Sequence, residues 1–310
     1  MALLEAADPL LEKLVAPDAA VLQIAAGMKF TEGPLWLRDA LLFSDIHSNR
    51  TALLRRTAEG PELTTFSKGP SNGMTLDARG RILLAEHHGR KVSVVAEDGS
   101  RTTLVDGFEG KHLNSPNDII VKADGAVYFT DPPYGIQWSP GGTTRPPNWW
   151  EIPLPGKEQP CNGVYRLLDD GRMDRLVDDF ALPNGLAFSP DERVLYIDDS
   201  ARSHIRAFEV LRDGTLGEGR VLLDMSSADP NVADGMKVDL DGNIFCTGPG
   251  GIWVCRPDGR FLGRIILPEL PANLAWGDDG TVLYVTARTS IYRLPTRTRG
   301  ALLGLEAVSP

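Results

Sequence analysis

A short turn motif recurs six times along the chain, and each copy leads into a run of apolar, strand-forming residues. Each copy holds a Glu, Asn or Asp, at positions 32, 72, 117, 184, 234 and 273. The intervals of 40, 45, 67, 50 and 39 residues lie close to the ~40–50 residues that form one propeller blade. The repeat therefore predicts an all-β chain, folded as a six-bladed β-propeller.

Asp-Gly pairs between the predicted strands support this fold, because Asp-Gly is a strong hairpin signal. One example is Asp124-Gly125, which separates the strand-like runs 119–121 and 126–130. The body of the chain shows no long amphipathic period, so alternating strands and helices are not expected. We predict a single domain over residues 1–310. Residues 1–27 form an N-terminal extension with one short helix over residues 8–15, capped by Asp8.

The longest interval contains an insertion over residues 132–160, which we expect to lie over the mouth of the central channel. Its Pro-Pro pairs and its aromatic residues Tyr134, Trp138, Trp149 and Trp150 do not fit a regular strand. Loops of this length in a compact domain are commonly functional. We interpret the insertion as a lid or pocket wall; a cover for apolar surface or a subunit contact is the alternative.

Composition excludes several classes of partner and site. A formal charge of −10 and a pI near 5.0 argue against a nucleic-acid partner, which requires clustered Lys and Arg. The cysteines Cys161, Cys246 and Cys255 are too few for a disulfide framework or a thiolate metal site. The N-terminus lacks a secretory pattern and no run could span a membrane. We therefore expect a cytoplasmic protein without a membrane partner, either a monomer or a small homo-oligomer.

Four of the six turns could hold a metal. The innermost strands of a propeller line its central channel, so their first residues converge at one end. Glu32, Asn117, Asn184 and Asp234 would supply two carboxylates and two amide oxygens, a set suited to a hard cation. We expect Ca²⁺, with Mg²⁺, Mn²⁺, Zn²⁺ or iron as alternatives. The opposing interpretation is that Asn and Asp stand there only as ordinary turn residues.

Five segments resemble the SMP-30/gluconolactonase family, in order and at compatible spacing over about residues 28–295. They are Phe30-Thr31-Glu32-Gly33-Pro34, Leu113-Asn114-Ser115-Pro116-Asn117-Asp118, Tyr128 to Gly135, Leu182-Pro183-Asn184-Gly185-Leu186 and Asp234-Gly235-Met236. The resemblance implies a six-bladed propeller with a divalent metal in its channel and hydrolysis of sugar lactones. Paraoxonases and diisopropylfluorophosphatase share that architecture, so phosphotriester hydrolysis is a related alternative.

The resemblance also implies roles for individual residues. Glu32, Asn184 and Asp234 match metal ligands, whereas Asn117 matches a ligand in some members and a substrate contact in others. Regucalcin-like members carry an Arg two residues before that Asn, where this chain has Ser115. Asp234 is the expected catalytic residue. We assign it as general base or water-orienting carboxylate, with direct nucleophilic attack as the competing mechanism.

Further polar residues near the same end of the channel are candidates for binding sugar hydroxyls. They are Asn72, His88, Asn117, Asp131, Tyr134 and Asn273. We expect Glu86-His87-His88 to end the inner strand of the second blade, and we interpret His47 and His204 as structural. Asp198-Asp199-Ser200 could take a second metal or support the first from behind, with ordinary turn residues as the alternative interpretation. Other functions that a propeller allows are a non-catalytic protein-binding platform and a strictosidine synthase-like condensing enzyme.

Overall fold

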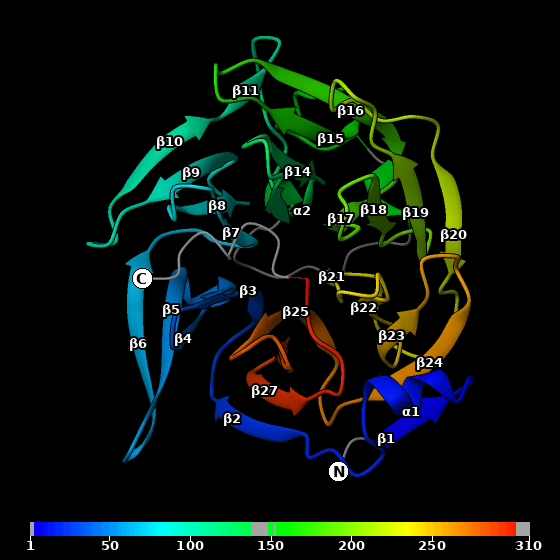
Figure 1. Cartoon of the computed structure of the whole chain (residues 1–310). Coiled ribbons are helices and arrows are strands. Elements are labelled where there is room, and N and C mark those ends of the chain that lie inside the picture. The colour runs from blue at the N-terminus through cyan, green and yellow to red at the C-terminus, as the bar shows by residue number, and fades with distance from the viewer. Residues whose placement is uncertain (1–2, 138–147, 152, 302–310) are drawn as a thin grey trace.

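The computed structural model describes residues 3–137, 148–151 and 153–301, which form six antiparallel sheets around a central axis (Figure 1). Each of these sheets is one blade, and its strands follow one another in sequence from the axis outward, except that the N-terminal segment supplies the outermost strand of two blades. The six-bladed all-β propeller expected from the repeat is therefore confirmed. Among the described residues, no helix is long and apolar enough to cross a membrane.

The first three blades contain four strands each. Blade 1 consists of β3 (Thr31–Leu37), β4 (Ala40–Asp45), β5 (Arg50–Thr57) and β6 (Gly60–Lys68). Blade 2 consists of β7 (Met74–Leu76), β8 (Ile82–Glu86), β9 (Lys91–Val95) and β10 (Arg101–Val105). Blade 3 consists of β13 (Ile119–Val121), β14 (Val127–Asp131), β15 (Asn162–Leu167) and β16 (Met173–Phe180). A separate hairpin of β11 (Gly107–Phe108) and β12 (Lys111–His112) joins blades 2 and 3.

The last two blades include strands from the N-terminal segment. Blade 4 consists of β17 (Pro183–Phe188), β18 (Val194–Asp199), β19 (His204–Glu209) and β20 (Arg220–Asp224). Blade 5 consists of β21 (Met236–Val238), β22 (Ile244–Gly248), β23 (Gly251–Cys255), β24 (Phe261–Ile266) and β1 (Leu3–Ala6). Blade 6 consists of β25 (Pro271–Gly277), β26 (Val282–Ala287), β27 (Ser290–Pro295) and β2 (Leu22–Ala26). Because β2 completes the last blade and leads into blade 1, the chain itself closes the ring.

The N-terminal segment therefore does more than the predicted extension, since it adds strands to two blades. The helix α1 (Leu10–Leu14) is shorter than expected, and the Asp8 carboxylate accepts a hydrogen bond from the Leu10 amide at 2.9 Å. Leu11 and Leu14 are buried against the apolar side chains of blades 5 and 6. This packing holds α1 on the outside of the propeller, as expected.

Hydroxyl groups join consecutive blades at four of the junctions. Each hydroxyl lies at the end of a second strand and donates to a carbonyl in the inner turn of the next blade. The four bonds are Ser44 Oγ to Asn72 O at 2.7 Å, Thr130 Oγ1 to Asn184 O at 2.7 Å, Ser200 Oγ to Ala233 O at 2.7 Å, and Thr247 Oγ1 to Ala272 O at 2.6 Å. They set the positions of the inner turns relative to one another.

The glycine in the inner turns permits this close approach. A Cβ atom on Gly33 would lie 1.9 Å from the carbonyl oxygen of Asn72, and Gly33 holds φ at +49°. A Cβ atom on Gly185 would lie 2.1 Å from the carbonyl oxygen of Asp234. Both contacts are with the backbone of the next blade, which cannot move aside like a flexible side chain. The recurrent glycine is thus a requirement of blade packing.

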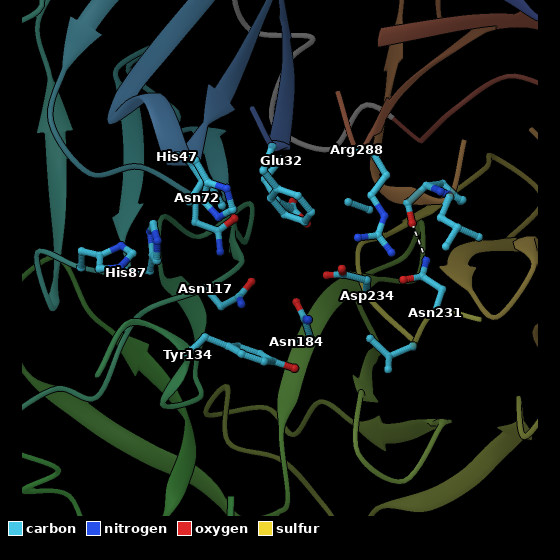
Figure 2. A pocket seen from close by; sticks show the side chains of 17 residues that line it. Glu32, His47, Asn72, His87, Asn117, Tyr134, Asn184, Asn231, Asp234 and Arg288 are labelled. Atoms are coloured by element: carbon cyan, nitrogen blue, oxygen red, sulfur yellow. Dashed lines mark hydrogen bonds between the residues drawn. The ribbon is translucent and has the colours of Figure 1, made fainter. Parts of the chain in front are cut away.

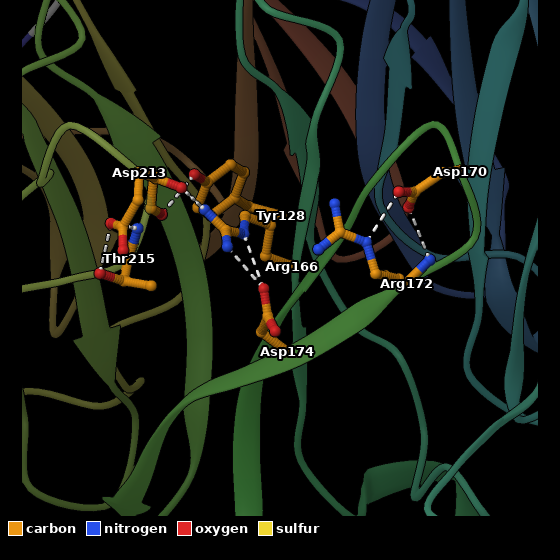
Figure 3. A network of polar contacts seen from close by, with 8 residues as sticks. Tyr128, Arg166, Asp170, Arg172, Asp174, Asp213 and Thr215 are labelled. Carbon is orange, nitrogen blue, oxygen red and sulfur yellow. Dashed lines mark hydrogen bonds and ion pairs between the residues drawn. The ribbon is translucent and has the colours of Figure 1, made fainter.

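A polar network outside the channel also joins two blades (Figure 3). The Tyr128 hydroxyl in blade 3 donates to the Gly214 carbonyl in blade 4 at 2.8 Å. Arg166 Nε donates to Asp174 at 3.1 Å, and its Nη1 donates to the Asp213 carbonyl. Arg166 is buried, so these bonds satisfy a guanidinium that would otherwise be costly to bury. The predicted Asp213-Gly214 hairpin turn is therefore also an inter-blade contact.

Candidate functional site

A cavity of about 380 Å³ opens at one end of the central channel. Figure 2 shows the labelled side chains arranged around it, directed inward from several blades. Seven of the residues predicted from the sequence line this cavity: Glu32, Asn72, His88, Asn117, Tyr134, Asn184 and Asp234. Pockets of a few hundred Å³ with convergent polar groups are typical of small-molecule sites.

The inner strands place the four predicted ligands on one level. Glu32 and Asn184 are the second residues of β3 and β17, and Asn117 and Asp234 stand two residues before β13 and β21. Glu32, Asn117 and Asn184 are buried, whereas Asp234 is partly exposed to the cavity. Residues up to 202 positions apart in the sequence are brought together because each blade starts at the channel.

Hydrogen bonds to neighbouring residues fix the orientation of the Glu32 and Asn184 side chains. Glu32 Oε2 accepts from the Gly33 amide at 2.7 Å and from Asn273 Nδ2 at 3.1 Å. Asn184 Nδ2 donates to Ser200 Oγ at 3.0 Å. Because the amide nitrogen faces Ser200, the other amide atom, Oδ1, is presented as an acceptor.

The donor set fits a hard divalent cation. Among the described residues, Asn72 Oδ1 and Asn184 Oδ1 are buried and have no hydrogen-bond partner, a rare state for a buried acceptor. Carboxylate and amide oxygens are the preferred ligands of Ca²⁺ and Mg²⁺. Within the same described residues, no three His, Cys, Asp or Glu side chains are grouped so that they could hold a metal. All four predicted ligands are carboxylates or amides, so the set itself contains none of the imidazole or thiolate ligands typical of zinc.

The raised pKa values of the carboxyl groups at the site also favour a bound cation. Burial raises the pKa of Glu32 to about 7, and the nearby Asp118 carboxylate adds to the increase. Burial also raises the pKa of Asp234 well above its usual range, with further contributions from Glu32, Asp198 and Asp118. Carboxyl groups gathered at a low-dielectric site without a sufficient countercharge favour their protonated forms. A bound cation would supply that charge and keep both carboxylates ionised.

Two predicted substrate contacts, Asp131 and Asn273, are not among the cavity-lining residues. The Asp131 carboxylate accepts from the backbone amides of Asn114 and Ser115 at 2.7 and 2.6 Å, which fixes the turn that carries Asn117. Asn273 donates to Glu32. Both residues thus hold ligand-bearing elements, and a direct contact with substrate stays a prediction for each.

One placement in the sequence analysis was wrong. Glu86 ends β8, the second strand of blade 2, whereas the inner strand is β7. His87 and His88 follow β8 and still reach the cavity, because second strands run antiparallel to inner strands and end where the inner strands begin. Burial lowers the pKa of His87 to about 3, so its imidazole is neutral at physiological pH.

Several lining residues were not predicted as site residues, among them His47 and Arg288. His47 had been interpreted as structural, and Arg288 had no assigned role. His47 lies two residues after β4, as His88 does after β8, and Arg288 lies one residue after β26, as His87 does after β8. The same register rule would have found both. His204, the other histidine interpreted as structural, does not line the cavity.

The described part of the insertion forms one wall of the site. Tyr134 begins the short helix α2 (Tyr134–Gln137) and lines the cavity. Trp149, in the 3-10 helix η2 (Trp149–Glu151), is buried with Leu154 and Leu182. The insertion therefore both borders the cavity and covers apolar surface. Trp138, which belongs to the same predicted lid, lies outside the described residues.

The thiols behave as expected from their spacing. Cys246 in β22 and Cys255 in β23 are buried and free, and Cys161 is partly buried and free. Burial raises the pKa of Cys255 to about 12. None of the three lines the cavity, so cysteine chemistry at this site is not supported.

Comparison with known proteins gives a family to this geometry. Residues 30–289 match the SMP-30/Gluconolactonase/LRE-like region. The chain belongs to this family. Among curated members, this SMP-30/gluconolactonase-family chain is 34% identical over 323 residues to the gluconolactonase of Zymomonas mobilis, covering 94% of this chain and 86% of the relative.

Solved structures agree with the family assignment. A structure described as a gluconolactonase of Xanthomonas campestris is 32% identical, with a TM-score of 0.82 and 94% of each chain covered. A structure from Agrobacterium tumefaciens, described as the calcium-binding protein regucalcin, is 18% identical, with a TM-score of 0.70 over 91% of this chain and 95% of that chain. At that identity the second likeness shows the fold alone.

Proposed function

We propose that this protein is a hydrolase that opens sugar lactones with the help of a divalent cation, converting an aldonolactone and water into an aldonic acid. The observation that carries the proposal is the ring of oxygen donors on the cavity floor, with Asn184 Oδ1 buried and lacking a hydrogen-bond partner among the described residues. The gluconolactonase relatives support the substrate class.

Glu32, Asn117, Asn184 and Asp234 would hold the cation, and Ca²⁺ suits an all-oxygen set best. When bound, the cation supplies Lewis-acid polarisation of the lactone carbonyl and stabilises the charge that develops on its oxygen. The protein holds Glu32 and Asn184 rigidly through Asn273 and Ser200. Such supporting contacts preorganise a site before the substrate arrives.

Asp234 is the residue that moves a proton in this scheme. Its carboxylate takes a proton from the attacking water as the new bond from oxygen to the acyl carbon forms. When the bond between the acyl carbon and the ring oxygen breaks, Asp234 returns the proton to that oxygen. Asn72, Asn117, His88 and Tyr134 line the same cavity, where they would orient the sugar hydroxyls.

The deciding experiment is lactone hydrolysis by chelator-stripped protein, followed by proton release and compared with a blank without enzyme. Activity restored by adding back Ca²⁺, Mg²⁺, Mn²⁺ or Zn²⁺ supports the proposal and identifies the cation. Protein that binds a cation but hydrolyses no lactone would contradict it and direct attention to phosphotriesters. Transfer of oxygen-18 from labelled protein to product would assign Asp234 as nucleophile rather than base.

A further inference from the structure

Arg288 is the one Lys or Arg among the cavity-lining residues that the structure describes. Figure 2 shows its side chain directed into the cavity on the side of Asp234. Among the described residues, its guanidinium forms no ion pair and no side-chain hydrogen bond, although many other arginines of the chain are paired with carboxylates, as Arg50 is with Asp45 at 3.1 Å. A guanidinium therefore faces the cavity with its donors available.

The backbone holds this side chain at the cavity. Arg288 begins the two-residue turn between β26 and β27, and its carbonyl accepts from the Thr31 amide at 2.8 Å and from Thr31 Oγ1 at 3.3 Å. The next residue, Thr289, donates its amide and its hydroxyl to Glu269 at 3.0 and 3.1 Å. The turn is thus tied to the residue next to Glu32, so Arg288 belongs to the rim of the proposed site.

The charges of the cavity favour an anion at this rim. A bound divalent cation would offset the charges of Glu32 and Asp234, and Arg288 adds a permanent positive charge at the rim. Burial lowers the pKa of His47, of His87 to about 3, and of His88, so these imidazoles are neutral at physiological pH. The protein as a whole carries a charge of −10, which makes a cationic cavity wall a local exception.

We infer that Arg288 determines specificity by binding an anionic substituent of the lactone, a carboxylate, sulfonate or phosphate on the part of the sugar away from the reacting ester. The ester must lie against the ligands on the floor, where Glu32 and Asn184 are buried, whereas Arg288 is exposed at the rim. A guanidinium matches these oxyanions with two parallel hydrogen bonds. The inference deepens the proposed function and rests on it.

The test compares kcat/KM for neutral gluconolactone, glucarolactone and phosphorylated gluconolactone, in the cation-loaded protein. We expect wild type to prefer an anionic lactone, and Arg288→Gln to lower the ratio of anionic to neutral kcat/KM by about 10- to 100-fold, the scale of a charge-assisted hydrogen bond. The lower kcat/KM for anionic lactones should result mainly from a higher KM. The preference of wild type should also weaken as ionic strength rises, because salt screens an exposed charge.

Arg38→Gln is the matched control. Arg38 is exposed, has a left-handed φ of 57° close to the 49° of Arg288, and lies between β3 and β4, at the opposite end of the propeller. Arg38→Gln should leave kcat/KM unchanged for both neutral and anionic lactones. An equal loss on neutral and anionic lactones in Arg288→Gln, or a wild type without preference, would overturn the inference.

A direct binding measurement separates this inference from the proposed function. Gluconate and phosphogluconate are titrated into wild type and Arg288→Gln by calorimetry, which requires no turnover. Tighter binding of phosphogluconate by wild type, lost in Arg288→Gln, supports the anion site even if no lactone is hydrolysed. Equal binding of both compounds by both proteins counts against it, whatever the hydrolysis assay shows.

Discussion

Ser200 links two of the proposed ligands, and its removal should weaken cation binding. The Ser200 hydroxyl is buried, accepts from Asn184 Nδ2 at 3.0 Å and donates to the Ala233 carbonyl, next to Asp234, at 2.7 Å. Ser200→Ala breaks both bonds. Without the first, Asn184 Nδ2 loses the Ser200 partner that helps to direct Oδ1 toward the proposed cation.

The magnitude follows from the two buried groups left without partners. Each buried polar group that loses its partner costs about 1–3 kcal/mol, so the loss of two partners in Ser200→Ala should lower the free energy of unfolding by about 2–6 kcal/mol. Loss of a contact that orients a metal ligand typically weakens metal affinity by about 10- to 100-fold. We expect the Kd for Ca²⁺ to rise by that factor, measured by calorimetry on chelator-stripped protein, with urea unfolding as the stability measurement.

Ser44→Ala provides the matched control. Ser44 is buried and makes the same type of inter-blade bond, to the Asn72 carbonyl at 2.7 Å. Unlike Ser200, its hydroxyl accepts no hydrogen bond from a ligand amide among the described residues. It should lose about 1–2 kcal/mol of stability with Ca²⁺ affinity close to wild type. A Ser200→Ala protein that binds Ca²⁺ within about threefold of wild type, or a Ser44→Ala protein equally impaired, would refute the reasoning.

Four further results are expected. Asp234→Ala should abolish lactone hydrolysis at saturating cation while the β-sheet circular dichroism stays unchanged; an active variant would remove Asp234 from the mechanism. In chelator-treated protein, the pKa of Glu32 is raised from 4.5 to about 7, so the folded state favours the protonated carboxyl group. The contribution of this group to stability is full below about pH 4.5 and is lost as the pH rises through about 7. Thermal unfolding of wild type should therefore lose stability over that window relative to Glu32→Gln, and parallel curves would contradict this. Gly185→Ala should cost about 3 kcal/mol or more because its Cβ would lie 2.1 Å from a backbone oxygen, whereas Gly217→Ala meets only ordinary contacts at 3.6 Å; equal melting temperatures would count against the packing argument. Asn117→Ala should raise the Kd for the cation if Asn117 is a ligand, and raise only KM if it contacts substrate.

The fold and the floor of the site were predictable because both depend on local signals that repeat. An Asp-Gly pair such as Asp241-Gly242 fixes a hairpin through its own backbone preferences, and Gly242 holds φ at +82° as the turn requires. The ligand positions follow from the same repeat, since every blade starts at the channel. Glu32, Asn184 and Asp234 could therefore be aligned without any knowledge of their distances.

The features that the sequence did not predict depend on contacts between segments that are distant in the sequence. Residues 3–6 and 22–26 are rich in Leu and Ala, which favour helix rather than strand, yet they become β1 and β2 by pairing with β24 and β27. Arg288 lies in an ordinary hairpin turn, and only the ring closure brings that turn beside Glu32. Such placements follow from tertiary pairing, which overrides local propensity.

The placement of the ligands also gives the cation a structural consequence. Each blade of a propeller contacts mainly its two neighbours, but Glu32 and Asn184 belong to blades 1 and 4, which face each other across the channel. A cation bound to both would connect blades that no strand pairing joins, and would offset the burial and the carboxylate repulsion that raise the pKa of Asp234. At a concentration 100 times its Kd, such a ligand adds about 2.7 kcal/mol to the free energy of unfolding. In the proposed scheme, the same carboxylates that bind the cation make the cation-free ring less stable, so the cation would add to the ring closure that β2 already provides.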